Sequence, residues 1–124
     1  MQLHTARVFV RDLAAAQAFY EQVLELPLQA GRAEDGFCVF GAGSCQLVVE
    51  PVTQDAPLEE QVLVGRFTGL SFSVNDIRAR HRELRARGVS FTGEPERQDW
   101  GGTLATFSDP AGNEIQLVEH PASA

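Results

Sequence analysis

The sequence predicts an α+β fold made of two βαβββ modules whose curved mixed sheets enclose a cavity. Two stretches, one beginning at Val10 and one at Val74, share a pattern: a valine that ends a strand, an aspartate, and an apolar residue that opens a helix. Each stretch is followed by short alternating segments separated by turn residues, which is typical of strands. Each half therefore has the order strand, helix, strand, strand, strand.

Chain length and composition predict one globular domain over residues 1–124. The hydrophobic fraction is 44% and the charged fraction 22%, which is typical of a folded chain rather than a disordered one. Pro51, Pro57 and several acidic residues predict a linker between the halves. We therefore expect module one at residues 1–52, a linker at 53–65 and module two at 66–120.

The charge and hydropathy patterns exclude two kinds of partner. A net charge of −7 argues against nucleic acid, because phosphate binding needs a basic face. No signal-like N-terminal segment is present, and no apolar run has the roughly 18 residues that a membrane helix needs. We expect a cytoplasmic protein with no nucleic-acid and no membrane partner.

The helix in each half is marked by its start and its apolar spacing. Asp12 and Asp76 suit N-caps, because an aspartate oxygen accepts hydrogen bonds from the free amides of a first turn. Gly88 stands where a helix C′ residue is expected. Apolar or packed residues recur at helical spacing: Leu13, Ala16, Tyr20 and Val23 in the first helix, and Ile77, His81 and Leu84 in the second. The arginines of the second helix are expected on a solvated face.

Alternation predicts the remaining strands. In the first half they are expected at residues 28–33, 36–40 and 45–52, and in the second at 89–92, 103–108 and 114–119. Residues 109–113, "DPAGN", form the turn between the last two. If Phe40 pairs with Cys45 across the turn in "CVFGAGSC", Cys38 faces Leu47 and the two sulfurs are diagonal neighbours. We expect two free thiols rather than a disulfide.

With these motifs in this order, the sequence resembles the vicinal oxygen chelate superfamily of glyoxalases, extradiol dioxygenases and bleomycin- and fosfomycin-resistance proteins. The resemblance depends on "VRDLAAAQAFYEQVLELPL", "LSFSVNDI…LRARGVSF" and "WGGTLATFSDPAGNEIQLVE" and covers nearly the whole chain. It implies paired βαβββ modules, a homodimer, and ligands bound in the concave sheet faces.

The same resemblance marks the positions of a metal site. In metal-dependent members a histidine precedes the first helix's aspartate by seven residues, which gives Thr5 here. The second histidine position is Gly69, and the glutamate after the Gly-Asn turn is Gln116. For the remaining ligand, Gln46 or Val48 is the nearer equivalent; Glu50 shares their parity but lies closer to the strand end. Divalent ions need imidazole or carboxylate donors, so we expect no metal and no other cofactor.

Strand parity selects the candidate ligand-binding residues. Because strand residues alternate faces, Thr5, Arg7 and Phe9 should face the cavity, while His4, Val8 and Val10 face the helix. An arginine offers a donor fork and an aromatic ring a stacking face. The predicted ligand-binding residues are Arg7, Phe9, Ser71, Trp100 and Gln116. Alternatively, Arg7 forms an ion pair with Glu50 or Glu114, and Trp100 covers a domain or dimer seam.

We therefore expect a metal-free protein that binds, and so sequesters, a small molecule. The first alternative is a metal-dependent lyase, isomerase or dioxygenase with a relocated site, in which a bulge in the first strand turns His4 toward Glu114 or Glu50. The second is a metal-free enzyme with Glu50 or Glu114 as base. Otherwise His4 and His120 are surface residues, Glu119 points outward, and His81 is a packed helix residue.

Overall fold

The computed structural model describes residues 1–122 and confirms the α+β class. It contains two compact units, each with one mixed sheet. The first unit comprises Met1–Arg66 together with Pro110–Asn113, and the second comprises Phe67–Asp109 and the chain from Glu114 onward. The predicted boundaries of the modules and linker stay a prediction. Within residues 1–122, no helix has the length and apolar character needed to cross a membrane.

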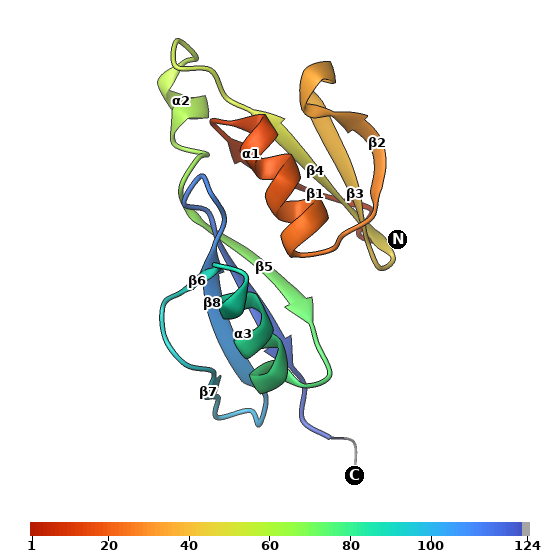
Figure 1. The fold of residues 1–124 in the computed structure, drawn as a ribbon, viewed down its shortest axis with the longest axis vertical. Helices are drawn as coiled ribbons and strands as arrows, with labels where there is room; N and C mark the ends of the chain where they lie inside the picture. Colours follow the sequence, from red (N-terminus) through yellow and green to blue (C-terminus); the bar gives the residue numbers. More distant parts are fainter. Residues whose placement is uncertain (123–124) are drawn as a thin grey trace. The chain divides into compact units, whose positions relative to one another are not determined.

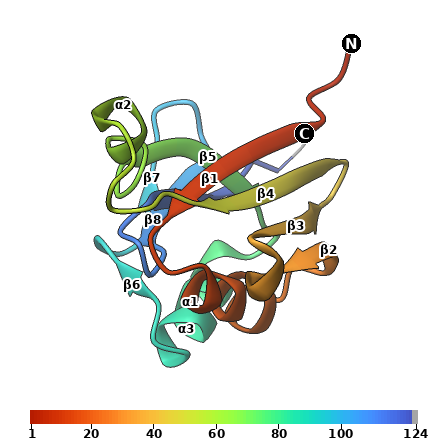
Figure 2. The ribbon, with the colours of Figure 1, turned by 90° about the horizontal axis from the view of Figure 1, so that it is seen from above.

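In the first unit, a helix lies against one face of a four-stranded sheet (Figure 1, Figure 2). The sheet order is β1-β4-β3-β2, with β1 parallel to β4 and the other pairs antiparallel. The elements in chain order are β1 (Thr5–Val10), α1 (Leu13–Ala18), the π-helical turn η1 (Phe19–Val23), β2 (Leu28–Arg32), the 3₁₀ turn η2 (Ala33–Asp35), β3 (Phe37–Ala42), β4 (Cys45–Pro51) and α2 (Leu58–Gln61).

The core of this unit lies between the sheet and α1, as the pattern predicts. Asp12 caps α1, because its Oδ1 accepts a hydrogen bond from the Ala15 amide at 3.1 Å. Tyr20 is fully buried, and its ring centroid is 5.8 Å from that of Phe40. Val8 and Val10 are also buried, so the expected parity of the first strand is confirmed.

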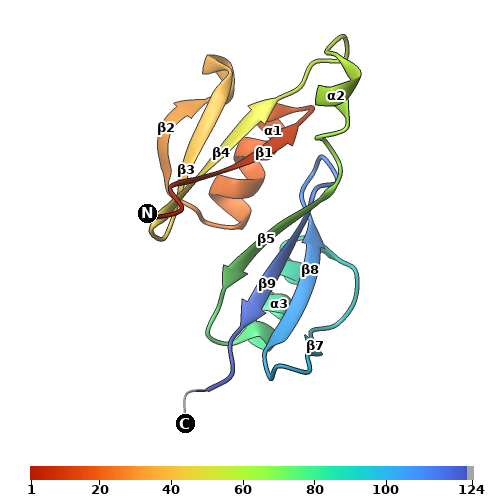
Figure 3. The same cartoon turned by 180° about the vertical axis from the view of Figure 1, so that it is seen from behind.

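The second unit repeats the arrangement with its own helix and sheet. Figure 3 shows β5, β9 and β8 side by side with α3 behind them. The order is β5-β9-β8-β6, and β7 pairs with β8. The elements are β5 (Phe67–Ser73), α3 (Ile77–Ala86), β6 (Ser90–Phe91), β7 (Glu96–Arg97), β8 (Thr103–Ser108) and β9 (Glu114–Glu119).

Helix α3 has the predicted caps at both ends. The Asp76 carboxylate accepts from the Ala79 amide at 3.1 Å. At the other end Gly88 takes a φ of +92°, and the Val89 amide donates to the Leu84 carbonyl at 2.9 Å. This six-to-one bond, with both Val89 and Leu84 buried, is a Schellman motif.

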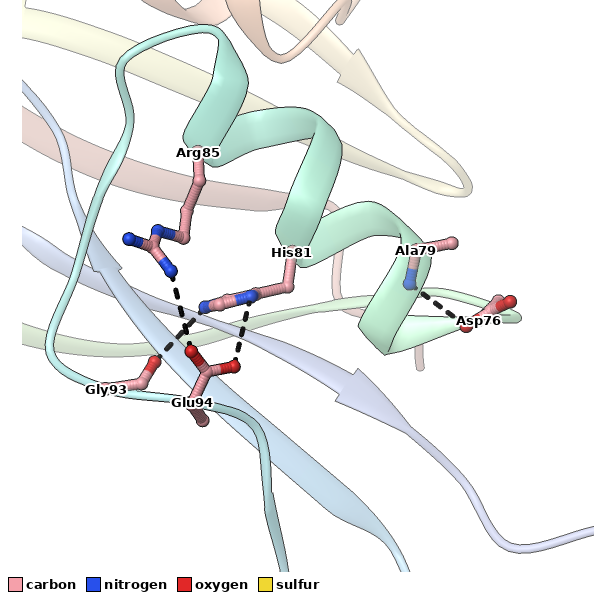
Figure 4. A network of polar contacts seen from close by, with 6 residues as sticks. All are labelled: Asp76, Ala79, His81, Arg85, Gly93 and Glu94. Carbon is pink, nitrogen blue, oxygen red and sulfur yellow. Dashed lines mark hydrogen bonds and ion pairs between the residues drawn. The ribbon is translucent and has the colours of Figure 1, made fainter.

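His81 is a packed residue of α3, as expected (Figure 4). Its ring lies 4.4 Å from that of Phe91, and its Nε2 is 3.2 Å from the Gly93 carbonyl oxygen. Its Nδ1 faces Glu94 at 3.7 Å, and Glu94 also pairs with Arg85 at 3.5 Å. These contacts fasten the segment after β6 to the helix.

Several elements differ from the prediction. After α1 the chain continues as the π-helical turn η1, which the apolar spacing of the sequence did not predict. A short helix, α2, forms inside the expected linker, and its Gln61 side-chain amide donates to the carbonyls of Thr53, Gln54 and Ala56. The strand expected at 89–92 shortens to β6, and the chain forms an additional strand, β7.

The predicted register of the β3–β4 hairpin is wrong by two residues. Phe40 pairs with Leu47 and Cys38 with Val49, while Ala42 pairs with Cys45. The reason is that the turn contains two residues rather than four, with Gly43 in the left-handed region at a φ of +65°. Both cysteines are free, and burial together with nearby acidic groups raises the pKa of the Cys38 thiol.

Candidate functional site

The candidate site is a pocket in the first unit, on the face of the sheet opposite α1. Its volume is about 420 Å³. It lies where β1 and β4 end and β3 begins, beside α2. The lining residues are Arg7, Phe9, Gly36, Glu50, Pro51, Val52 and Glu60. Two of the predicted ligand-binding residues, Arg7 and Phe9, are therefore brought together.

Arg7 forms the ion pair with Glu50 that the sequence left as one of two alternatives. Arg7 Nη2 is 3.0 Å from Glu50 Oε1, and the side chains are 60% and 27% exposed. The residues are on neighbouring parallel strands, with Phe9 directly beside Glu50 in the register. Because Arg7 stays mostly exposed, its remaining donors are accessible. A metal-free enzyme with Glu50 as its base would require this carboxylate to be enclosed in an apolar cavity, and it is not.

The Asn113 side chain binds the backbone at Phe9. The sequence predicted only that Asn113 ends the turn at residues 109–113. Its side chain is 1% exposed. Its Nδ2 donates to the Phe9 carbonyl at 2.8 Å, and its Oδ1 accepts from the Gly65 amide at 2.8 Å and the Arg66 amide at 3.4 Å. One amide thus ties β1 to the chain that follows α2. The available signal in the sequence was an asparagine directly after Gly112, at the end of the turn.

The positions that a metal would occupy in related proteins carry unsuitable donors in both units. In the first unit, the Thr5 hydroxyl is 2.6 Å from His4 Nδ1, and Gln46 donates to the Gln29 side chain at 3.2 Å. In the second unit, Gln116 donates to the Thr106 hydroxyl at 3.2 Å, and Gly69 has no side chain. None is an imidazole or carboxylate, so these residues do not fit a divalent ion.

Gly69 has a backbone role that the sequence reading missed. The sequence marked Gly69 only as a metal-ligand position without a suitable side chain. Instead, Gly69 has a φ of +75° where β5 shifts register against β9, between Phe67 and Ser71. A Cβ there would meet nothing within 4 Å, so conformation rather than space favours glycine.

The bulge required for a relocated metal site does not occur in β1. Its pairing with β4 is unbroken from Thr5, opposite Gln46, to Val10, opposite Pro51. His4 precedes the strand and is exposed. Across residues 1–122, histidine, cysteine and carboxylate side chains form no group of three or more that could hold an ion.

In the second unit, the predicted ligand-binding residues Ser71 and Gln116 lie on neighbouring strands of the sheet. Ser71 and Gln116 are direct partners on β5 and β9, and Thr106 stands opposite Gln116 on β8. These three form a polar strip on the sheet face opposite α3. Glu119 does not point outward as expected; its Oε1 accepts from the Ile77 amide at 3.0 Å, which satisfies a free donor at the start of α3.

Trp100 lies in the loop between β7 and β8 and is 53% exposed. Its ring centroid is 6.0 Å from that of His120, an exposed residue as expected. Each glycine of "WGGT" has a distinct role. Gly101 takes a φ of +98°, and Gly102 leaves room for the indole, because a Cβ at Gly102 would overlap Trp100 Cζ3 and Cη2.

Replacing Gly102 by alanine should therefore displace the indole. Trp100 is the sole tryptophan, so its fluorescence reports this loop directly. We expect a red-shifted emission and stronger quenching by acrylamide. Gly93→Ala is the matched control, because a Cβ at Gly93 meets nothing within 4 Å and its φ is not positive. Unchanged emission in Gly102→Ala would contradict the described packing.

Comparison with known proteins gives relatives along the whole chain. The uncharacterized protein YraH of Bacillus subtilis is 27% identical over 126 residues, which covers 96% of this chain and 98% of YraH. A crystal structure of a superfamily member from Sphaerobacter thermophilus is 30% identical with a TM-score of 0.78, covering 97% of this chain and 98% of that one.

Two further solved structures have stated functions. TnmS3, an antibiotic binding protein from Streptomyces, is 27% identical with a TM-score of 0.76, covering 98% of this chain and 97% of TnmS3. A lactoylglutathione lyase from Agrobacterium tumefaciens has the same TM-score at 21% identity, with 95% and 92% covered, and so shares the fold. Because the Glyoxalase/Bleomycin resistance protein/Dioxygenase superfamily also matches residues 2–117, nearly the whole length, this chain belongs to that superfamily.

Proposed function

We propose that the protein binds a small organic molecule without a metal ion and acts by sequestration. The observation that carries this proposal is the pocket in the first unit, in which Phe9 and Arg7 line one open space beside Glu50. Its volume of about 420 Å³ is within the usual range for small-molecule sites. An aromatic face with a few polar groups can hold and orient a ligand with no nucleophile or base.

The second unit has predicted ligand-binding residues of its own. Ser71 and Gln116 offer a hydroxyl and an amide side by side on one sheet face. Trp100 offers a half-exposed indole suited to stacking. The similarity to TnmS3, which is an antibiotic binding protein, supports a binding role of this kind.

The metal-dependent alternative lacks support from the donor chemistry. Thr5, Gly69 and Gln116 provide no imidazole and no carboxylate at three of the four positions that the family resemblance marks. Arg7 already engages Glu50 at 3.0 Å. The lyase resemblance is one of fold at 21% identity and carries no activity to this chain.

The proposal is tested by calorimetric titration of chelator-treated protein against a panel of aromatic and peptide-like small molecules. At least one compound should bind, and addition of divalent ions should not change its affinity. Phe9→Ala should weaken that binding about tenfold, because burying an aromatic side chain against a ligand contributes one to three kcal/mol. Phe67→Ala is the control, since Phe67 is an exposed strand phenylalanine outside the pocket.

Two results would contradict the proposal. The first is a panel in which nothing binds the chelator-treated protein. The second is stoichiometric uptake of a divalent ion that is required for ligand binding or turnover. A loss in Phe67→Ala equal to that in Phe9→Ala would place the ligand outside the first-unit pocket. The homodimer and the cytoplasmic location stay predictions.

A further inference from the structure

The pocket of the first unit contains more acidic than basic side chains, which bears on the ligand's charge. Its lining residues include two acidic residues, Glu50 and Glu60, and one basic residue, Arg7. Arg7 and Glu50 are paired at 3.0 Å, so their opposite charges partly offset each other. Within residues 1–122, the Glu60 side chain forms no ion pair and no hydrogen bond.

One further cation lies near the pocket without lining it. Arg11 Nη1 donates to the Val52 carbonyl at 3.4 Å, so its charge is directed at a backbone oxygen. Among the residues that line the pocket, Glu60, on the short exposed helix α2, has a charge without an ion-pair partner in residues 1–122. Arg7 was predicted to offer a donor fork to a ligand, and its pairing with Glu50 weakens that role.

Phe9 provides the second element of recognition. Its side chain lines the same pocket, and its backbone is fixed by the Asn113 amide at 2.8 Å. An aromatic face attracts an organic cation through its negative π-surface, and such contacts are stronger where water is partly excluded. A carboxylate and an aromatic ring in one pocket favour a positively charged amine over a neutral or anionic group.

We propose that this pocket binds the cationic amine of a small aromatic ligand, with Glu60 as the counter-charge and Phe9 as the π-face. This inference rests on the proposed small-molecule-binding function and adds to it the charge class of the ligand. A net charge of −7 on the whole chain favours the approach of such a ligand at low ionic strength.

Three probes that share a phenylethyl group and differ in the charge of its terminal group are titrated into ¹⁵N-labelled protein: 2-phenylethylamine, 2-phenylethanol and 3-phenylpropionate. The amine should bind about fivefold tighter than the alcohol, and the propionate weakest, from the combined strength of a cation–π contact and an exposed ion pair. The largest changes in amide chemical shift should occur at Phe9, Gly36 and Glu50. The advantage of the amine should shrink in high salt.

Glu60→Gln should reduce the amine's affinity to about that of the alcohol, because it removes the charge and keeps the shape. Glu59→Gln is the matched control: Glu59 is the preceding residue of α2, is exposed like Glu60, and does not line the pocket. Equal losses in both variants would show a long-range charge effect and overturn the assignment of Glu60.

The remaining outcomes distinguish the proposed amine site from the proposed small-molecule-binding function on which it rests. Equal binding of amine and alcohol at the pocket amides would overturn the preference for a cation while leaving small-molecule binding intact. Tightest binding of the propionate would return the selecting role to Arg7. If none of the three probes shifts the pocket amides, the assignment of an amine site to this pocket fails, while small-molecule binding is still decided by the titration panel.

Discussion

Asn113→Ala should lower the free energy of unfolding by about 3 kcal/mol, because it removes three hydrogen bonds made by one buried amide. The side chain is 1% exposed and joins the Phe9 carbonyl to the amides of Gly65 and Arg66. Alanine would leave those backbone groups without their partner and leave a small cavity as well. Equilibrium denaturation with urea measures the loss.

Asn75→Ala is the control for Asn113→Ala. Asn75 is exposed and precedes the cap of α3, so its replacement should change the stability by less than about 0.5 kcal/mol. Amides of β1 around Phe9 should also exchange faster in Asn113→Ala. If the two variants unfold at the same urea concentration, Asn113 does not hold β1 to the chain after α2.

Gly31→Ala should cost about 2 to 3 kcal/mol, from two separate causes. Gly31 has a φ of +72°, where an L-residue with a Cβ is strained by roughly 1 to 2 kcal/mol. A Cβ would also overlap the Phe37 carbonyl oxygen, a backbone atom of the paired strand β3. That oxygen cannot move without disturbing the β2–β3 pairing, so the overlap adds to the strain.

Gly43→Ala separates the two causes. Gly43 has a similar φ of +65°, but a Cβ there meets nothing within 4 Å. It should therefore show the strain of the left-handed backbone alone, about 1 to 2 kcal/mol. Urea denaturation of both variants gives the difference, and hydrogen exchange of the β2 amides shows where it acts. Losses of the same size would mean that β2 moves aside and the overlap costs nothing.

Local sequence signals predicted most of the secondary structure because the relevant physics is local. Asp12 and Asp76 cap their helices through bonds to amides three residues away, and Gly88 ends α3 by its own backbone freedom. The last two strands, β8 and β9, have the predicted bounds. The predicted register of the β3–β4 hairpin was wrong, because a two-residue turn and a four-residue turn are both compatible with the alternation of residues in the two strands.

The candidate site was predictable only in part. Parity placed Arg7 and Phe9 on the open face of the sheet, where they line the pocket. Glu60 was not predicted, because it lies on a helix inside what the composition indicated to be a linker. The structural role of Asn113 was also missed, because its partners Phe9 and Gly65 are far away in the chain.

By itself, the sequence determined the α+β class, the two repeated modules and the absence of metal-binding side chains at Thr5, Gly69 and Gln116. These follow from residue type, spacing and alternation, which act over a few positions. Only the tertiary structure decided that Arg7 is paired with Glu50 and that Glu60 joins them around Phe9. Such contacts depend on strand register and on the path of the chain after β4, because both bring distant residues within a few ångströms of each other.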